Sequence, residues 1–121
     1  MERETFDWNG MDGEPARRFH VSDMWRDIGS EHLQVNEIDI MLDQPTYDLL
    51  MRDRGVEEWR VRRLTPLKLE IPGLLCHFPA DDSHLLVDGT HRYIRLWRDG
   101  IREMPCFVIS YNDWQSYAEK I

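Results

Sequence analysis

The chain has 121 residues, of which 23 are acidic and 15 are Lys or Arg, so its formal net charge is −8. This length suits a single domain that folds around its own core. A hydrophobic fraction of 41% with five Trp excludes a disordered chain, and the acidic balance argues against nonspecific DNA binding, which needs a surplus of Lys and Arg. The sequence has no apolar run of about 18 residues and no basic, apolar leader, so we expect neither a membrane span nor a signal peptide.

The cysteines Cys76 and Cys106 form neither a disulfide framework nor a zinc-binding pattern. We interpret them as buried thiols of a protein in the reducing cytoplasm. Four histidines lie away from the stretch discussed below and show no ligand spacing with the cysteines: His20, His32, His77 and His84. A zinc site is therefore not expected.

The N-terminal segment 1–18 is acidic and contains residues that interrupt regular structure, namely Gly10, Gly13 and Pro15. We expect it to form an irregular arm that Phe6 and Trp8 attach to the body of the protein. The folded domain is then expected to span residues 19–121.

The next segment predicts a short strand over 19–21, followed by a helix over 23–28. Ser22 has the side chain of an N-cap for this helix, and Gly29 is a typical residue to end it. Residues 30–44 fit a strand only if the buried face switches along it, and they also fit a helix. The pattern leaves both alternatives open.

Helical spacing of apolar residues predicts helices over 46–54 and 57–63. Apolar and charged residues then alternate over 66–71, which is typical of a half-buried strand. The Pro-Gly pair at 72–73 indicates a turn, and 74–78 is expected to return as the partner strand or as an irregular extension of it.

The last part of the chain predicts a strand over 84–87, a helix over 90–99 and a buried strand over 104–109. In the tail, Asn112 with Gln115 three residues later is typical of a capping box that begins a helix. The elements with the clearest patterns therefore follow one another as strand, strand, helix, strand and helix.

The clearest chemical signal is a sharp turn between a strand that ends in Asp88 and a helix that begins at Thr90 or His91. Gly89 at the turn permits a backbone conformation or a close approach that a side chain would block. The free N–H groups and the dipole of the first helical turn favour an anion at this point. Thr90 adds a hydroxyl, His91 an imidazole and Arg92 a guanidinium suited to phosphate oxygens.

Ordinary structural interpretations of these residues remain open. An Asp-Gly pair is common in strand-to-helix turns, and His91 and Arg92 can be surface residues. Cations at a helix start oppose its dipole, however, unless an anion offsets them. Asp88 is the best candidate for a catalytic carboxylate and for a Mg²⁺ ligand, with His91 as the second candidate catalytic residue.

Other arginines recur along the chain, and a stripe of them is one way to bind nucleic acid. One set follows the helix over 90–99: Arg92, Arg95, Arg98 and Arg102. A second set is interspersed with acids: Arg52, Arg54, Arg60, Arg62 and Arg63. We interpret both sets as solvated helix faces, because apolar residues occupy the opposite face of the first and acids dilute the second.

The sequence Val-Asp-Gly-Thr-His-Arg-Tyr at 87–93, the helix that ends at Gly100 and Met-Pro-Cys-Phe-Val-Ile at 104–109 resemble the core of the ParB/sulfiredoxin superfamily. Thr-Pro-Leu-Lys-Leu at 65–69 is similar to the family's Pro-Leu strand, and the whole resemblance covers about residues 64–110. The resemblance implies an α+β fold with a small mixed sheet and flanking helices. It also implies that a nucleoside triphosphate, ATP or CTP, binds with Mg²⁺ at the turn. The phosphates would be held by Gly89, Thr90, His91 and Arg92.

Members of this superfamily use the site for CTP-dependent switching, for phosphoryl transfer or for sulfinic acid reduction. Thr90 stands where sulfiredoxins have their catalytic Cys, so the reduction is not expected. The DNA-reading domain of ParB proteins has no counterpart in this sequence, so a partition clamp is not expected either. Three hypotheses follow: a Mg²⁺-dependent phosphotransferase or triphosphatase, a non-enzymatic plasmid- or phage-type module that docks on a host or cognate protein, and a metal-dependent DNase.

Overall fold

The structure is a computed structural model that describes residues 4–11 and 13–121. The elements in chain order are β1 (Phe6–Trp8), β2 (Arg17–Phe19), α1 (Val21–Gly29), β3 (Asn36–Met41), α2 (Gln44–Asp53), α3 (Glu58–Arg62), α4 (Pro66–Leu69), β4 (Gly73–Phe78), β5 (Ser83–Asp88), α5 (Thr90–Arg98), β6 (Glu103–Ile109), α6 (Tyr111–Trp114), the 3₁₀ helix η1 (Gln115–Tyr117) and β7 (Ala118–Lys120). The predicted α+β class with small sheets and flanking helices is confirmed. In this described part, no helix is both long enough and apolar enough to span a bilayer.

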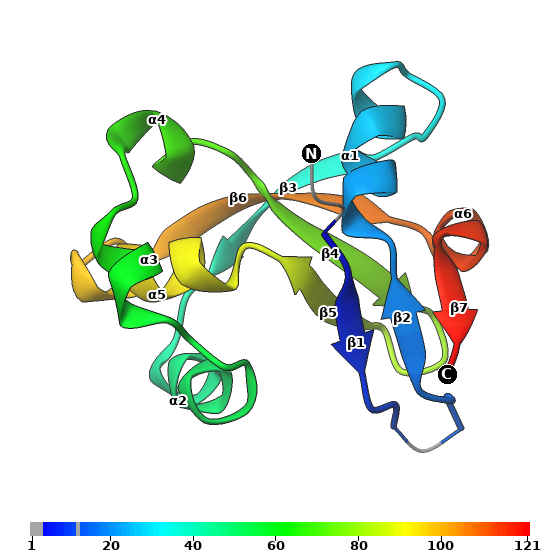
Figure 1. Cartoon of the computed structure of the whole chain (residues 1–121), viewed down its shortest axis with the longest axis horizontal. Helices are drawn as coiled ribbons and strands as arrows, with labels where there is room; N and C mark the ends of the chain where they lie inside the picture. Colours follow the sequence, from blue (N-terminus) through cyan, green and yellow to red (C-terminus); the bar gives the residue numbers. More distant parts are fainter. Residues whose placement is uncertain (1–3, 12) are drawn as a thin grey trace.

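The described residues form a central sheet with the strand order β3-β6-β4-β5 and a small sheet with the order β1-β2-β7. The central sheet is mixed, because β4 runs parallel to β6 while β3 and β5 run antiparallel to their neighbours. Figure 1 shows α2, α3, α4 and α5 on one side of the view, and α1, α6 and the small sheet on the other. The long strands β4 and β6 connect these two groups.

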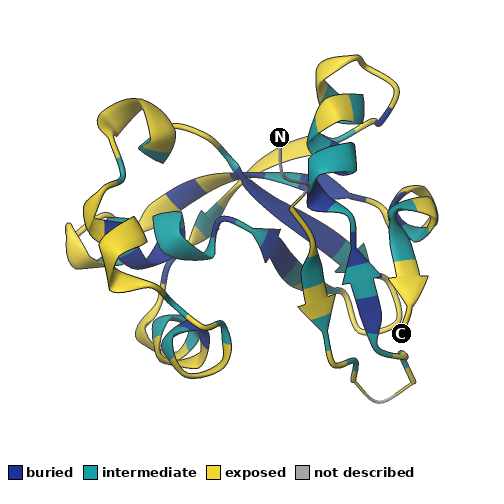
Figure 2. Ribbon diagram, in the orientation of Figure 1, coloured by how far each residue is buried: buried dark blue, intermediate teal, exposed yellow. Residues whose placement is uncertain are grey.

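Both faces of the central sheet are covered at its inner strand β4, which explains why β4 is almost continuously apolar and buried, whereas the edge strand β3 is mostly exposed. Leu74 and Cys76 face a cluster that includes Met24 of α1 and Trp114 of α6. Leu75, which points the opposite way, belongs to a second cluster with residues of α2, α3 and α5. Figure 2 shows the inner strands as the buried centre, with the exposed surface on the helices and the small sheet.

The prediction of an irregular arm over 1–18 is wrong at residues 6–8, which form β1, and at residues 17–18, which begin β2. Residues 1–3 and 12 of the expected arm lie outside the described residues. Phe6 and Trp8 do attach β1 to the body, since their rings lie 6.2 and 6.4 Å from that of Phe19. β2 pairs with β1 on one side and with β7 on the other.

The boundaries of α1 and α2 also differ from the prediction. The strand predicted over 19–21 is shifted, because β2 ends at Phe19 and α1 begins at Val21, and Ser22 is therefore not the N-cap of α1. The hydroxyl of Ser22 instead accepts a 2.6 Å hydrogen bond from the backbone N–H of Glu4. The alternative left open over 30–44 resolves as strand β3, and Asp43 then caps α2 by accepting a 2.7 Å hydrogen bond from the backbone of Thr46.

The strand predicted over 66–71 is wrong, because its first residues form the short helix α4. Thr65 is the N-cap, and its hydroxyl accepts a 3.3 Å hydrogen bond from the N–H of Lys68. Pro66 occupies the first helical turn, where its missing N–H costs nothing. These local signals prevail over the apolar alternation, and Leu67 remains 78% exposed as a result.

The capping box predicted at Asn112 is wrong as well. The N-cap of α6 is Ser110, and the helix extends only to Trp114 before η1 and β7 follow. The hydroxyl of Ser110 donates a 2.9 Å hydrogen bond to the carboxylate of Asp113. This short helix turns the chain from the central sheet to the small sheet.

Candidate functional site

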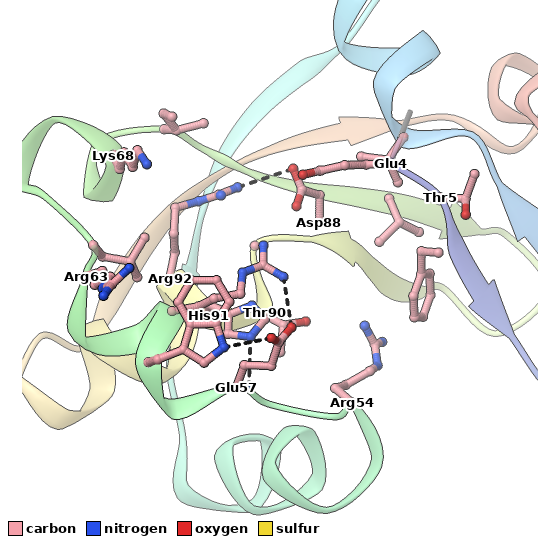
Figure 3. A pocket seen from close by; sticks show the side chains of 18 residues that line it. Glu4, Thr5, Arg54, Glu57, Arg63, Lys68, Asp88, Thr90, His91 and Arg92 are labelled. Atoms are coloured by element: carbon pink, nitrogen blue, oxygen red, sulfur yellow. Dashed lines mark hydrogen bonds and ion pairs between the residues drawn. The ribbon is translucent and has the colours of Figure 1, made fainter. Parts of the chain in front are cut away.

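A cavity of about 970 Å³ lies where β5 gives way to α5. β1 borders it on one side, and the segment from α3 to α4 borders it on the other (Figure 3). All five residues that the sequence singled out line this cavity: Asp88, Gly89, Thr90, His91 and Arg92. Its volume lies at the upper end of the range typical of small-molecule sites, about 300–1,000 Å³.

The turn at Gly89 requires glycine for two reasons. Its φ of 113° is one that L side chains rarely adopt. A Cβ there would also lie 3.1 Å from the Cα of Gly73 and 3.3 Å from Nη2 of Arg92. Gly89 is the N-cap of α5, and because glycine has no side chain, none caps the first turn of the helix. The first N–H groups of α5 therefore lie beside the cavity without a side-chain acceptor.

Asp88 is held in place by contacts from two directions. Its Oδ2 accepts a 2.7 Å hydrogen bond from the indole N–H of Trp25 and lies 3.6 Å from Nη2 of Arg92. That same Nη2 donates a 3.0 Å hydrogen bond to the carbonyl oxygen of Pro72. The other carboxylate oxygen, Oδ1, accepts no hydrogen bond from the described residues, and neither does the buried Nε of Arg92 find an acceptor among them. Asp88 thus keeps one acceptor atom, and Arg92 one donor atom, that can form a further hydrogen bond.

The carboxylates around the cavity fit Mg²⁺ that is bound together with phosphates. No cluster of three or more His, Cys, Asp or Glu able to hold a metal occurs within residues 4–11 and 13–121. Mg²⁺ in phosphoryl-transfer sites is held by one or two carboxylates, phosphate oxygens and water, so such a cluster is not required. Glu4, Glu57 and Asp88 are the carboxylates among the described residues that line the cavity. Of these, Asp88 is next to the turn and has an open oxygen.

His91 has a different environment from the one expected of a phosphate-binding cation. Its Nε2 accepts a 3.2 Å hydrogen bond from the backbone N–H of Glu57, so this nitrogen carries no proton. Burial lowers the pKa of His91, and the charge of Arg60 lowers it further. The imidazole is therefore neutral near pH 7 and offers its Nδ1–H as a donor. It also joins the start of α3 to the start of α5.

The side chains missed by the sequence analysis form a basic wall around the cavity. Its cations are Arg54, Arg60, Arg63, Lys68 and the predicted Arg92. Figure 3 shows Arg63 and Lys68 on one side of the cavity and Arg54 on the other. The interpretation of the arginines over 52–63 as a solvated face holds for Arg60 and Arg63, which are exposed although they line the cavity, and is wrong for the partly buried Arg54. Arg60 and Arg63 are three residues apart on a helical segment, and this spacing was the available signal.

Arg54 is a partly buried member of the basic wall. It donates a 2.7 Å hydrogen bond to the carbonyl oxygen of Leu86, and its guanidinium lies 4.3 Å from the ring centre of Phe6. Burial lowers its pKa, but an arginine keeps its charge at any physiological pH. Arg54 therefore brings a positive charge to the border between α2 and β1.

The arginines of α5 were also interpreted as a solvated face; this holds for the exposed Arg98 and is wrong for the partly buried Arg95, and both side chains bind neighbouring helices. Arg95 donates a 3.0 Å hydrogen bond to the carbonyl oxygen of Val61. Arg98 donates to both carboxylate oxygens of Glu58, at 2.7 and 2.8 Å, and to the hydroxyl of Tyr47. These bonds fix α3 and α2 against α5, so they position the basic wall.

Comparison with known proteins gives one partial similarity. The chain is 35% identical over 43 residues to the ATP-dependent L-serine kinase of Desulfurococcus mucosus. The matched segment covers 36% of this chain and 17% of the kinase, so it spans only a small part of that relative. No family model matches the chain, and no solved structure matches it.

Proposed function

We propose that the cavity binds a nucleoside triphosphate with Mg²⁺ and that the protein transfers or releases its terminal phosphoryl group. The observation that carries the proposal is the concentration of positive charge. Among described residues, five of the chain's 15 Lys and Arg line the cavity, against three of its 23 acidic residues. In a chain of net charge −8, this local excess of cations favours a highly charged anion.

The turn supplies the binding chemistry for the phosphates. The N–H groups of the first turn of α5, which no side chain caps, and the positive end of the helix dipole are suited to phosphate oxygens. Arg92 adds a guanidinium that Asp88 and Pro72 hold in one orientation. Arg63 and Lys68 approach from the opposite wall and would neutralise the remaining charge.

Phosphoryl transfer depends mainly on positioning and charge stabilisation, so few catalytic groups are needed. Mg²⁺, held by Oδ1 of Asp88 together with the phosphates, would neutralise charge that develops on the phosphoryl oxygens. His91 would donate from Nδ1, and the hydroxyl of Thr90 is a further donor beside the turn. The partial similarity to an ATP-dependent kinase supports phosphoryl transfer from ATP in particular. Membership of the ParB/sulfiredoxin superfamily, a group that includes phosphotransferases, belongs to the same proposal.

Thermal unfolding in the presence of ATP, ADP, CTP, GTP or UTP, each with and without Mg²⁺, tests the binding step. A ligand at 100 times its Kd stabilises the fold by about 2.7 kcal/mol, which raises the Tm of a domain of this size by several degrees. Arg92→Ala should abolish the shift. Arg102→Ala is the matched control, because Arg102 packs on Trp97 and does not line the cavity.

Release of phosphate and transfer to candidate hydroxyl acceptors, followed with γ-labelled nucleotide, test the reaction itself. Turnover that Arg92→Ala removes and Arg102→Ala retains would support the proposal. Binding without any turnover would favour a non-enzymatic module that uses the nucleotide as a signal. Absence of binding by any nucleotide would overturn the proposal.

A further inference from the structure

We infer that Trp59, on α3, is the platform on which the base of the bound nucleotide stacks. The inference rests on the proposed function, because it assigns a place to the part of the ligand that the phosphate-binding turn does not explain. It is carried by the position, exposure and fixed orientation of one indole within the cavity.

Trp59 lines the cavity and is 50% exposed, although large aromatic side chains are usually buried. Its ring is nevertheless fixed. The indole N–H donates a 2.9 Å hydrogen bond to Oε2 of Glu57, and the guanidinium of Arg63 lies 5.7 Å from the ring centre. A fixed and half-exposed indole offers a flat apolar surface at little conformational cost.

The position of Trp59 relative to the turn suits a nucleotide. The backbone N–H of Glu57 donates to His91 at the start of α5, while the carboxylate of Glu57 accepts from Trp59. A single residue therefore links the indole to the phosphate-binding turn. A ligand that consisted of phosphate alone would have no flat group to contact the indole. A nucleotide has a planar base, which is separated from the phosphates by the ribose.

The surroundings of Trp59 support stacking in preference to recognition of base edges. Ile71, which is 43% exposed, and Leu64 also line this cavity and provide apolar contact. The guanidinium of Arg63 lies over the indole ring and makes a cation–π contact with it. Because every base has a π-face, a stacking platform tolerates different bases. Trp59 therefore provides affinity for a nucleotide over inorganic polyphosphate and distinguishes weakly between ATP and CTP.

The decisive experiment compares two ligands on the same variants by calorimetric titration with Mg²⁺: ATP, which has a base, and inorganic tripolyphosphate, which has none. Loss of one base–aromatic stack costs about 5- to 150-fold in affinity. Trp59→Ala should weaken ATP binding by this factor and leave tripolyphosphate binding within about twofold of wild type. Trp59→Phe keeps an aromatic face and should retain most of the ATP affinity. Leu67→Ala is the matched control, since Leu67 is exposed on α4 and does not line the cavity.

A spectroscopic readout tests the contact directly. Stacking of a base on Trp59 should quench part of the tryptophan fluorescence when ATP binds, and Trp59→Phe should remove that part of the quenching. Tripolyphosphate should bind without it.

Equal loss of both ligands in Trp59→Ala, or no loss of ATP, would overturn the inference while leaving the proposed function in place. Failure of wild-type protein to bind either ligand would overturn both. If the wild-type protein binds tripolyphosphate as tightly as ATP, the role of Trp59 is overturned, but the proposed phosphate binding is not.

Discussion

The indole N–H of Trp25 in α1 donates a 2.7 Å hydrogen bond to the carboxylate of Asp88 at the end of β5, 63 residues further along the chain. This bond joins the helix on one side of the central sheet to the turn that begins α5 on the other side. It holds Oδ2 of Asp88, while Oδ1 accepts no hydrogen bond from the described residues. Trp25 therefore determines how a side chain of the candidate site is presented, although it does not line the cavity.

Trp25→Phe should reduce the free energy of unfolding by about 1–3 kcal/mol, because a mostly buried carboxylate loses a hydrogen-bond donor. The aromatic contact of this side chain with Phe107 would remain, so the loss reports mainly on the hydrogen bond. Urea unfolding measures the change. Trp59→Phe, at an exposed position, should leave the free energy of unfolding within about 0.5 kcal/mol of wild type. Equal effects of the two substitutions would show that the hydrogen bond to Asp88 does not add to the free energy of unfolding.

Gly89→Ala should destabilise the protein by about 1–3 kcal/mol and reduce nucleotide binding, because it adds steric crowding to an unfavourable φ. Gly100→Ala separates the two causes. Gly100 also has a positive φ, of 82°, but a Cβ there would meet nothing within 4 Å. Its substitution should cost only the conformational part, about 1 kcal/mol, and should leave nucleotide binding unchanged. A nucleotide affinity that Gly89→Ala leaves intact would contradict the role of the turn.

The stability of the protein should depend on pH through His91. Its pKa is lowered from the ordinary value of 6.5 in the folded protein, so the unfolded chain binds the proton more readily. The contribution of His91 is therefore fully present above pH 6.5 and is lost as the pH falls through its lowered pKa. Urea unfolding of wild type and His91→Gln at several pH values between about 5 and 8 measures this contribution. The difference between the two proteins should shrink as the pH falls, and a constant difference would contradict the neutral, buried imidazole.

Both cysteines should be unreactive in the folded protein. Burial raises the pKa of Cys106 to about 11 and that of Cys76 higher still, and both side chains are almost completely buried. The thiolate is the reactive form, so a thiol-specific colorimetric reagent should label neither residue at neutral pH. Both should react after unfolding in guanidinium chloride, which is the internal control. Rapid labelling of the native protein would show that the core around β4 and β6 opens readily.

The sequence predicted the candidate turn because its signals are local. Gly89 and Gly100 bracket one amphipathic helix, and the buried strands before and after it have continuous apolar patterns. Such signals depend only on neighbouring residues. The helix, both strands and the clustering of the five residues at the turn all followed from them.

The parts of the structure that the sequence did not predict depend mostly on contacts between residues far apart in the sequence. β1 and β2 are three-residue strands with no periodic pattern, and β2 exists because it pairs with β7 at the other end of the chain. The basic wall depends on the packing of α3 against α5, where Arg95 and Arg98 bind α3, and the spacing of Arg60 and Lys68 does not specify those bonds. The alternation of apolar and charged residues over 66–71 gave a wrong prediction of a strand. Six positions are too few to distinguish a strand from one helical turn that Thr65 caps.

The pairing of β2 with β7 has a consequence for synthesis of the protein. β1, which carries Phe6 on the border of the cavity, is hydrogen-bonded only to β2 within the described sheet, and β2 in turn pairs with residues 118–120. Domains generally fold as units. β1 and β2 can pair with each other early, but their sheet is completed only after residues 118–120 have been made. A nascent chain that lacks β7 would already contain every side chain of the cavity, yet the small sheet that supports its β1 border would still lack one strand.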